Sequence, residues 1–519
     1  MFWRDTICLM GIPVDRVTAG EALGRIFALM HAYREDRRPR LATSLTAGFV
    51  VNALSGWSRV PRNPELLRVL READLVTAGG RPLTWLCRRL GAPLAGHVSG
   101  PHLVLSLARE ANRRGKSVYL LGATPEVAKR AADVLRMLFI DLKVAGEDSA
   151  GGRTDGMPGV NAERREAEIC RRINESGADI LLLGLGNPEQ EMWFHRNRGR
   201  LQVPVTVGVD SSFAFVGGGL LPAPAWMQRC GLEWLYWLAH GPVGLWRRYV
   251  RDAGNFILLA LPVIWASGKL RRKLQPHGIT SPQSLTTGLC RLEGAAGRRL
   301  ALLELPKSLV NETVEASGPG IVEHAFGAHA LVVDASALCF ADAAGIGFLM
   351  ALQRECAARG QGFCLSGHSH ARGLMQMNRV WDLFAPHACA SGGDAALRLE
   401  ERWGGPFCCL GIATAGGVRR VWLFGRLTGG AAHVLNRLAE QLLETPSDCI
   451  LDLDGCAEAD SSGLVELVKI ANILSAGGKT LLLVRVPDPV RNLMKAVGLD
   501  DILAAHPDYA SARMALDPG

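Results

Sequence analysis

In the N-terminal half, the residues best suited to chemistry follow a short run of leucines. Gly184 and Gly186 form a tight turn, and Asn187 as N-cap predicts a helix whose first turn carries Gln190 and Glu191. Ligands bind beyond the carboxyl ends of strands in open α/β sheets, and N–H groups at a helix start suit a diphosphate. The pattern therefore indicates an anion site, although a plain capped strand-turn-helix has the same residues.

A second chemical signal lies in the C-terminal half, in the Asp-Ser-Ser-Gly sequence of residues 460–463. A serine at a helix start is a good N-cap, which explains the motif without any further function. A phosphate on Ser461 would be stabilised by the helix N-terminus and would add nearly two negative charges to the surface. The motif therefore also suits a phosphorylation switch for partner binding.

A third signal is an apolar run between basic clusters at residues 241–275. The run Phe256–Ala266 has Trp246 and Trp265 near its ends, and Asp252 is the single acid of the segment. The flanking basic residues are Arg247, Arg248, Arg251, Lys269, Arg271, Arg272 and Lys273. We expect residues 251–275 to lie on an anionic membrane surface. The alternative is a helix that packs on its domain with a solvated basic face.

The composition is that of an ordinary globular protein, with 48% hydrophobic and 21% charged residues in a chain of 519. A net charge of +8 is too small to indicate nucleic acid as a partner. The 13 cysteines include no C-x-x-C pair, so we expect reduced, buried thiols and neither a disulfide framework nor a metal site. No signal peptide is predicted, and no stretch reaches the roughly 18 uninterrupted apolar residues of a membrane-spanning helix.

The elements that must position these residues alternate between strand and helix over residues 1–240. The predicted strands are Arg40–Leu45, Ala73–Thr77, Ser117–Leu121, Asp179–Leu185 and Val203–Val209. The predicted helices are Ala19–Tyr33, Pro64–Ala73, Pro101–Arg114, Pro125–Phe139, Ala162–Ser176, Pro188–Arg198 and Ala225–Ala239. This alternation predicts a Rossmann-like, mainly parallel α/β sheet, with its glycine turns along one edge.

The C-terminal half contains an internal repeat. Residues 276–297 are rich in Gly, Ser, Thr and Pro and are predicted to be a linker. Beyond it, Leu331–Gly347 aligns with Cys449–Val465 at an offset of 118 residues. Two small α/β domains are therefore predicted, at residues 298–402 and 416–516.

Both repeats resemble STAS domains, the anti-sigma-factor-antagonist module. In that family a partner kinase phosphorylates the first serine of Asp-Ser-Ser-Gly, which is Ser461 here. The first copy retains Asp342 but has Ala343 and Ala344 in place of the serines. The resemblance implies an anti-sigma-type kinase or another STAS partner for the second copy, and at most constitutive docking or packing for the first.

Residues from about 8 to 255 resemble the WecG/TagA/CpsF glycosyltransferases, so residues 1–250 are predicted to be such a domain. The match includes Gly11–Asp15, a GLG-x-P-x-QE-x-W block at Gly184–Trp193, and Arg247–Tyr249. These enzymes transfer N-acetylmannosamine or a related sugar from a UDP donor to a polyprenyl-diphosphate-linked acceptor. The resemblance implies the following UDP-sugar-binding residues: Gly122, Gly184, Gly186, Gln190 and Glu191. The arginines implied to contact the membrane or the lipid diphosphate are Arg247, Arg248, Arg251, Arg271 and Arg272.

Several polar residues typical of that family are replaced. Gly79 stands where a P-D-G turn has its Asp, His97 and His102 replace the Arg and Asp of an R-V-x-G-x-D element, and Ala214 replaces the Asp of F-D-F. Inverting sugar transfer needs a base near the acceptor hydroxyl. His102 and Asp210 are the candidate catalytic replacements, although ordinary surface and turn roles also fit them.

The sequence thus predicts a transferase for cell-surface polysaccharide synthesis, with no metal or other cofactor, controlled by its STAS pair. It would be cytoplasmic and peripherally associated with the inner face of the membrane, and it would bind no nucleic acid. The alternative is a catalytically inactive fold that senses nucleotide sugars and signals through the STAS pair. The lost polar residues favour the alternative, and the retained glycine-rich block favours the enzyme.

Overall fold

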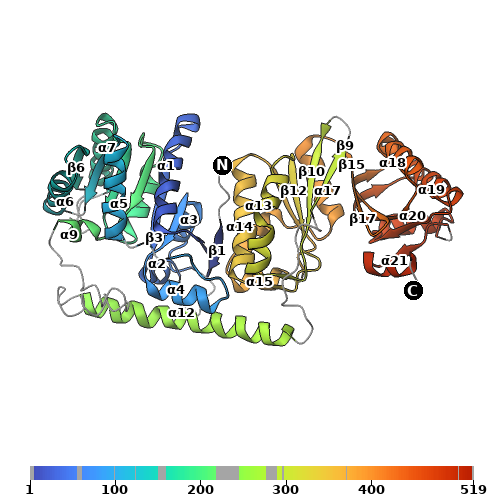
Figure 1. Cartoon of the computed structure of the whole chain (residues 1–519), viewed down its shortest axis with the longest axis horizontal. Coiled ribbons are helices and arrows are strands. Elements are labelled where there is room, and N and C mark those ends of the chain that lie inside the picture. The colour runs from blue at the N-terminus through green and yellow to red at the C-terminus, as the bar shows by residue number, and fades with distance from the viewer. Residues whose placement is uncertain are drawn as a thin grey trace. The chain divides into compact units, whose positions relative to one another are not determined.

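The computed structural model describes residues 5–54, 61–96, 98, 100–122, 124–149, 159–217, 245–275, 289–294, 297–369, 371–500 and 502–516. The chain divides into two compact units, Arg4–Lys269 and Leu270–Gly519 (Figure 1). The predicted helix Ala225–Ala239 lies outside the described residues, as does His97.

The first unit is built on a six-stranded parallel sheet in the order β4-β3-β8-β7-β5-β6. Its strands are β3 (Arg40–Leu45), β4 (Leu75–Ala78), β5 (Ser117–Gly122), β6 (Lys143–Ser149), β7 (Ile180–Gly184) and β8 (Val205–Gly208). A hairpin of β1 (Thr6–Leu9) and β2 (Ile12–Asp15) precedes it. The predicted parallel α/β fold is confirmed, while this hairpin and β6 were not predicted.

Helices surround this sheet. They are α1 (Ala19–Asp36), α2 (Ala47–Ala53), α3 (Pro64–Glu72), α4 (Arg81–Arg89), α5 (Gly100–Arg113), α6 (Pro125–Leu138), α7 (Gly159–Glu175), α8 (Glu189–Asn197) and α9 (Ser212–Val216). Local sequence fixes several starts: Thr18 and Glu21 form a capping box on α1, and Asn63 caps α3 ahead of Pro64. The helix predicted from Pro188 begins one residue later, with Pro188 rather than Asn187 at the N-cap position.

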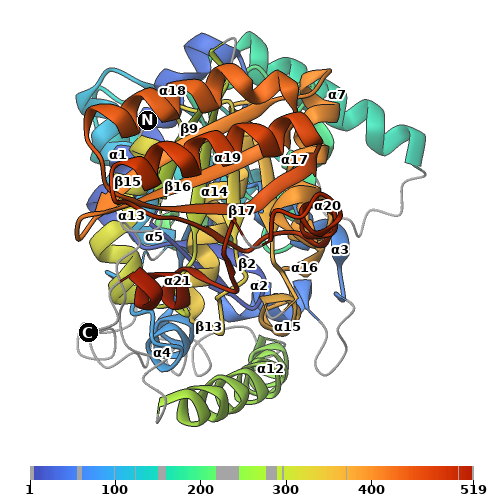
Figure 2. The same cartoon turned by 90° about the vertical axis from the view of Figure 1, so that its right-hand side faces the viewer.

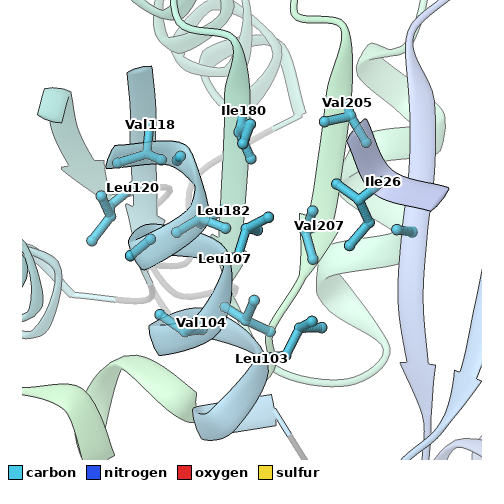
Figure 3. Close-up of a cluster of buried hydrophobic side chains, with 14 of the residues drawn as sticks. Ile26, Leu103, Val104, Leu107, Val118, Leu120, Ile180, Leu182, Val205 and Val207 are labelled. Carbon is cyan, nitrogen blue, oxygen red and sulfur yellow. The ribbon is translucent and has the colours of Figure 1, made fainter. Parts of the chain in front are cut away.

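The core of this unit lies on both faces of the sheet. On one face, α1 and α5 pack on β5, β7 and β8 through residues such as Ile26, Leu107 and Leu182 (Figure 3). The alternate residues Leu181 and Leu183 are equally buried on the other face. Burial on both sides explains why β7 is a continuous apolar run rather than an alternating one.

Helix α12 (Leu245–Leu274) follows and contains the apolar run and its basic flanks. Phe256, Leu259 and Ala260 are buried, so one side of the helix packs on protein. Its exposed large apolar side chains are Val250, Ile257, Leu258, Leu261 and Trp265. By length and composition alone, Val250–Leu274 could cross a membrane.

The second unit contains one nine-stranded sheet in the order β14-β12-β10-β9-β15-β16-β17-β18-β19. The first repeat contributes β9 (Leu289–Gly294), β10 (Arg299–Glu304), β12 (Ala330–Asp334) and β14 (Gly362–Ser366), and the second contributes β15 (Cys408–Ala415), β16 (Val418–Leu427), β17 (Asp448–Ala459), β18 (Leu481–Val484) and β19 (Ala505–His506). The short strands β11 (Ser308–Leu309) and β13 (Phe340–Ala341) pair separately. The helices are α13 (Asn311–Ala325), α14 (Ala343–Ala358), α15 (Ala371–Met377), α16 (Trp381–Phe384), α17 (Gly392–Trp403), α18 (Ala432–Glu444), α19 (Ser461–Ala476), α20 (Asp488–Ala496) and α21 (Tyr509–Leu516).

The two repeats have the same element order, a hairpin followed by helix, strand, helix and strand. They are joined edge to edge, because β9 pairs antiparallel with β15. The predicted linker, residues 276–297, is therefore wrong for Leu289–Gly294, which form a strand. The stretch left unassigned between the predicted domains, residues 403–415, likewise contains the whole of β15.

The repeats also share a core and a charge cluster. Leu302 and Val332 of the first repeat pack in one buried cluster with Phe424 of the second. The Arg485 guanidinium lies 2.5 Å from Asp334 Oδ2 and 2.7 Å from Asp452 Oδ2, so it joins equivalent aspartates of the two repeats. The two repeats therefore form a single folded body.

Candidate functional site

The glycine turn after β7 meets the turn after β8 at the carboxyl edge of the first sheet. A Cβ at Gly184 would overlap the Phe213 ring of α9, so only glycine fits there. Gly186 has φ +81°, and a Cβ at that position would lie 3.6 Å from Asp210 Oδ1. The two turns thus bring the predicted binding residue Gly186 next to the predicted catalytic residue Asp210.

Gln190 and Glu191 form the floor beneath these turns rather than an exposed surface. Their exposed fractions are 1% and 0%. Gln190 Oε1 accepts a hydrogen bond of 2.9 Å from the backbone N–H of Asp210, and its Nε2 donates one of 2.7 Å to Glu191 Oε1. Gln190 therefore fixes the Asp210 turn, and direct contact of Glu191 with a ligand would need the floor to open.

The Glu191 carboxyl is buried, and only one of its two oxygens accepts hydrogen bonds from described residues. The Thr43 hydroxyl of β3 donates a 2.6 Å hydrogen bond to Glu191 Oε1, while Oε2 is buried without a partner among the described residues. Burial raises the pKa of the Glu191 carboxyl to about 8, and the hydrogen bonds from Thr43 and Gln190 only partly offset this. The Glu191 carboxyl ties β3 to α8 at the carboxyl edge of the sheet.

Gly208, at the end of β8, allows this close approach. A Cβ there would lie 2.8 Å from Gln190 Nε2 and 3.1 Å from Glu191 Oε1. Gly122, at the end of β5, is similarly tight against Ala128 of α6, at 3.0 Å. These glycines serve close packing at the strand ends, whatever they bind.

A serine fills the space beside Gly79, the position where the family has the Asp of its P-D-G turn. A Cβ at Gly79 would lie 2.5 Å from Ser44 Oγ, and that hydroxyl donates a 3.2 Å hydrogen bond to the Val98 carbonyl. Gly100 is crowded in the same way by Ser212 Oγ at 2.5 Å. His102, the other predicted catalytic residue, is exposed on the first turn of α5.

A polar cluster that the sequence did not indicate brings α12 to this edge. A Cβ at Gly48, in the first turn of α2, would lie 3.7 Å from Asp252 Oδ2 and 3.9 Å from Asn187 Nδ2. Asn52 Nδ2 in turn donates a 3.2 Å hydrogen bond to Asn187 Oδ1. The single acid of α12 thus lies beside the glycine turn of β7. In the sequence, the only indication that Asp252 has a special role was its position as a single acid among many arginines.

The structure describes the side chains of three of the five arginines that were predicted to contact the membrane or the lipid diphosphate. The side chains of Arg247 and Arg248 lie outside the described residues, although both belong to α12. Arg251 is exposed, and its Nε lies 3.5 Å from Asp252 Oδ1. Arg271 and Arg272 are exposed in the last turn.

The predicted switch residue Ser461 is exposed at the first position of α19. Asp460 caps this helix, because its Oδ1 accepts a 2.8 Å hydrogen bond from Gly463 N–H. In the first repeat Asp342 caps α14 in the same way, but the neighbouring Ala343 and Ala344 are buried. Burial raises the pKa of the Asp342 carboxyl to about 6.

The described residues contain no group of three or more His, Cys, Asp or Glu side chains that could hold a metal ion. The twelve cysteines in the described part of the chain are free thiols, and all of these except Cys339 are buried.

Comparison with known proteins assigns the class. The model of the glycosyl transferase WecG/TagA/CpsF family matches residues 7–275, and a second model, for the STAS domain of the Mlab type, matches residues 410–504. The chain therefore belongs to the WecG/TagA/CpsF glycosyltransferase family and carries a STAS domain. The first repeat is not matched by the STAS model, and its assignment stays a prediction from the internal repeat.

Curated relatives include N-acetylglucosaminyldiphosphoundecaprenol N-acetyl-beta-D-mannosaminyltransferases of three bacteria. The Bacillus spizizenii protein is 30% identical over 187 residues, which is 36% of this chain and 68% of the relative. The Bacillus subtilis protein is 26% identical (34% and 64%), and the Staphylococcus aureus protein is 25% identical (34% and 69%). The chain thus spans about two thirds of the length of these relatives.

Solved structures similar to parts of this chain include an anti-sigma factor antagonist from Mycobacterium paratuberculosis. It is 20% identical and covers 20% of this chain and 90% of its own, with a TM-score of 0.19. The phosphorylated Bacillus cell fate determinant SpoIIAA is 15% identical and covers 20% of this chain and 98% of its own, with a TM-score of 0.18.

Proposed function

We propose that this chain transfers an N-acetylhexosamine of the N-acetylmannosamine type from a UDP-sugar to a polyprenyl-diphosphate-linked acceptor in cell-surface polysaccharide synthesis. Family membership and the names of the curated relatives support the reaction class. The observation that carries the proposal is the buried polar pair at the strand ends, where Gln190 holds the Asp210 turn against the glycine turn of β7. Burying polar side chains costs free energy, so a domain without a binding function would have no need of two such residues at a strand end.

In this proposal each polar group has a distinct task. Backbone groups of the turn at Gly184–Gly186 cradle the diphosphate, since glycine lets the backbone approach closely. The carboxylate of Asp210, or the exposed imidazole of His102, accepts the proton of the acceptor hydroxyl. Gln190 and Glu191 act from beneath, by positioning the turns that bind the donor.

The alternative function is a catalytically inactive fold that senses nucleotide sugars. It is favoured by one observation, the Ser44 hydroxyl that occupies the space next to Gly79 where the family's Asp would project. Because a neighbouring side chain fills the space left by the missing Asp, the site is adapted to the loss of that residue.

The membrane part of the proposal rests on α12. Its Phe256 and Leu259 are buried against protein while the apolar residues of its other side are exposed, so the helix is suited to lie along a surface rather than to span it. The exposed Arg271 and Arg272 would meet anionic head groups. We propose a cytoplasmic protein held at the inner face of the membrane.

The regulatory part rests on Ser461. Its exposure at a capped helix start makes the hydroxyl accessible to a kinase of the anti-sigma type, and the phosphate would lie beside the helix N–H groups. The buried alanines leave the first repeat without such a switch.

Measurement of UDP release tests the transferase. Wild type, Asp210→Ala and His102→Ala are compared with UDP-N-acetylhexosamines and a lipid-diphosphate acceptor, alongside direct binding of the UDP-sugar. We expect turnover in the wild type and a loss of at least a hundredfold in one of the two variants. Binding of the UDP-sugar without any turnover would support the sensor function instead. If the wild type showed neither binding nor turnover, both functions would be refuted.

A further inference from the structure

The outward face of α4 is composed of arginine, tryptophan and proline. Leu83, Leu86 and Cys87 are buried and anchor the helix on its unit. The residues exposed on the opposite face are Arg81, Pro82, Trp85, Arg88 and Arg89. The helix contains no acidic residue, so this face has a charge of +3 and a large aromatic ring at its centre.

Trp85 is the unusual member of this face. It is 45% exposed, and the Arg89 guanidinium lies over its ring at 5.8 Å from the centroid. A half-exposed indole next to arginines is typical of the interface between a membrane and water, where the ring sits among head groups.

A solvated basic helix is the simpler explanation, and α7 shows what such a helix looks like in this protein. There Arg171 pairs with Glu175 on the same helix, and Arg172 pairs with Asp148. On α4, by contrast, Arg88 and Arg89 form no ion pair with any described residue. Two cations without acidic partners next to an exposed indole indicate an anionic partner outside the chain.

The position of α4 identifies the partner. In two perpendicular views α4 lies beside α12 (Figures 1 and 2). It also begins directly after Gly80, at the carboxyl end of β4, so it borders the edge of the sheet that carries the candidate site. Because α4 lies beside α12, a bilayer bound by α12 would be the nearest extended anionic surface to the arginines of α4.

We propose that α4 is a second membrane-contact element, and that its Arg81, Trp85, Arg88 and Arg89 face bind anionic phospholipid head groups. This inference rests on the proposed membrane contact of α12. Two helices fix the orientation of a protein on a surface where one leaves it free to rotate about its axis. The pair would hold the sheet edge that carries the candidate site toward the lipid from which a polyprenyl-linked acceptor arrives.

Co-sedimentation of the full chain with vesicles tests the inference. The vesicles contain phosphatidylglycerol and phosphatidylethanolamine, with neutral phosphatidylcholine vesicles for comparison. The variant Arg81→Gln/Arg88→Gln/Arg89→Gln is matched by Arg164→Gln/Arg165→Gln/Arg171→Gln on α7, which changes the net charge equally. We expect at least a tenfold loss of anionic-vesicle binding for the α4 variant, a severalfold loss for Trp85→Ala, and less than a twofold change for the α7 variant.

Two results would overturn the inference. If the α4 variant bound like the wild type, the partner of this face would be something other than lipid, and equal losses in both variants would show a general charge effect. Circular dichroism of each variant verifies that it is folded. Failure of the transferase proposal is a separate outcome, since it is measured as UDP release by wild type on a detergent-solubilised acceptor without vesicles.

Discussion

The substitution Glu191→Gln tests the buried acid at the carboxyl edge of the first sheet. Burial raises the pKa of this carboxyl to about 8, while an unfolded chain ionises it near 4.5. Between these two pH values the carboxyl is therefore protonated in the folded state and ionised in the unfolded state. The carboxyl's contribution to stability is complete below about pH 4.5 and is lost as the pH rises to about 8, at about 1.4 kcal/mol per pH unit.

Glutamine cannot ionise but keeps an oxygen for the hydrogen bonds from Thr43 and Gln190. The variant should therefore lose much less stability than the wild type between pH 5 and pH 8. Near pH 5 it should differ from the wild type by about 1 kcal/mol or less, because the replaced Oε2 has no partner among the described residues.

Hydrogen–deuterium exchange with mass spectrometry is the appropriate assay, because peptides from β3, β7 and α8 report on this unit separately from the C-terminal one. Comparing variant and wild type at each pH cancels the intrinsic pH dependence of exchange. Glu189→Gln on the same helix, where the side chain is 28% exposed and lies 3.3 Å from Arg196, is the matched control. An unchanged pH slope in Glu191→Gln would refute a protonated Glu191.

Three further predictions concern other parts of the chain. Gly79→Ala should destabilise the first unit by about 1 kcal/mol in chemical denaturation, since Ser44 must rotate away from the new Cβ and lose its hydrogen bond to the Val98 carbonyl. Adding Ser44→Gly should recover part of this loss. If the stability changes of the two substitutions were simply additive, the contact between these residues would be contradicted. Incubation with the cognate kinase should phosphorylate the wild type but not Ser461→Ala, as read by mass spectrometry; phosphate at another residue would exclude the switch. Arg485→Met should lower the hydrogen-exchange protection of both repeats together and reduce their free energy of unfolding by about 3 kcal/mol or more, because it leaves Asp334 and Asp452 without their shared cation. A loss of protection confined to the second repeat would show that the repeats fold independently.

The strand-helix alternation of the first unit could be predicted from local sequence. Apolar runs such as that of β7 and start signals such as Asn63-Pro64 act over a few residues, so their elements were found close to their observed bounds. The β1–β2 hairpin and the seven-residue α2 were missed, whereas β4 and β8, which also have only four residues, were found, so the local pattern of such short elements is not a dependable guide. The start of α8 was placed one residue early because local capping rules cannot position a single residue.

The candidate site could be located from the sequence but not assembled from it. The glycine block correctly pointed to the carboxyl end of β7, yet it did not show that Glu191 is buried and bonded to Thr43, a residue 148 positions away. The cluster of Asp252 with Asn187 and the filling of the space at Gly79 by Ser44 also depend on contacts between distant segments. No periodicity or motif contains such information.

By itself, the sequence determined the α/β class, the internal repeat and the glycine turns, because hydrophobic period and backbone freedom are local properties. Only the tertiary structure decided that the two repeats are one body, since pairing of β9 with β15 depends on which strand edges meet. It also decided that the pKa of Glu191 is raised, because a pKa responds to burial and neighbours, which the chain acquires only when it folds.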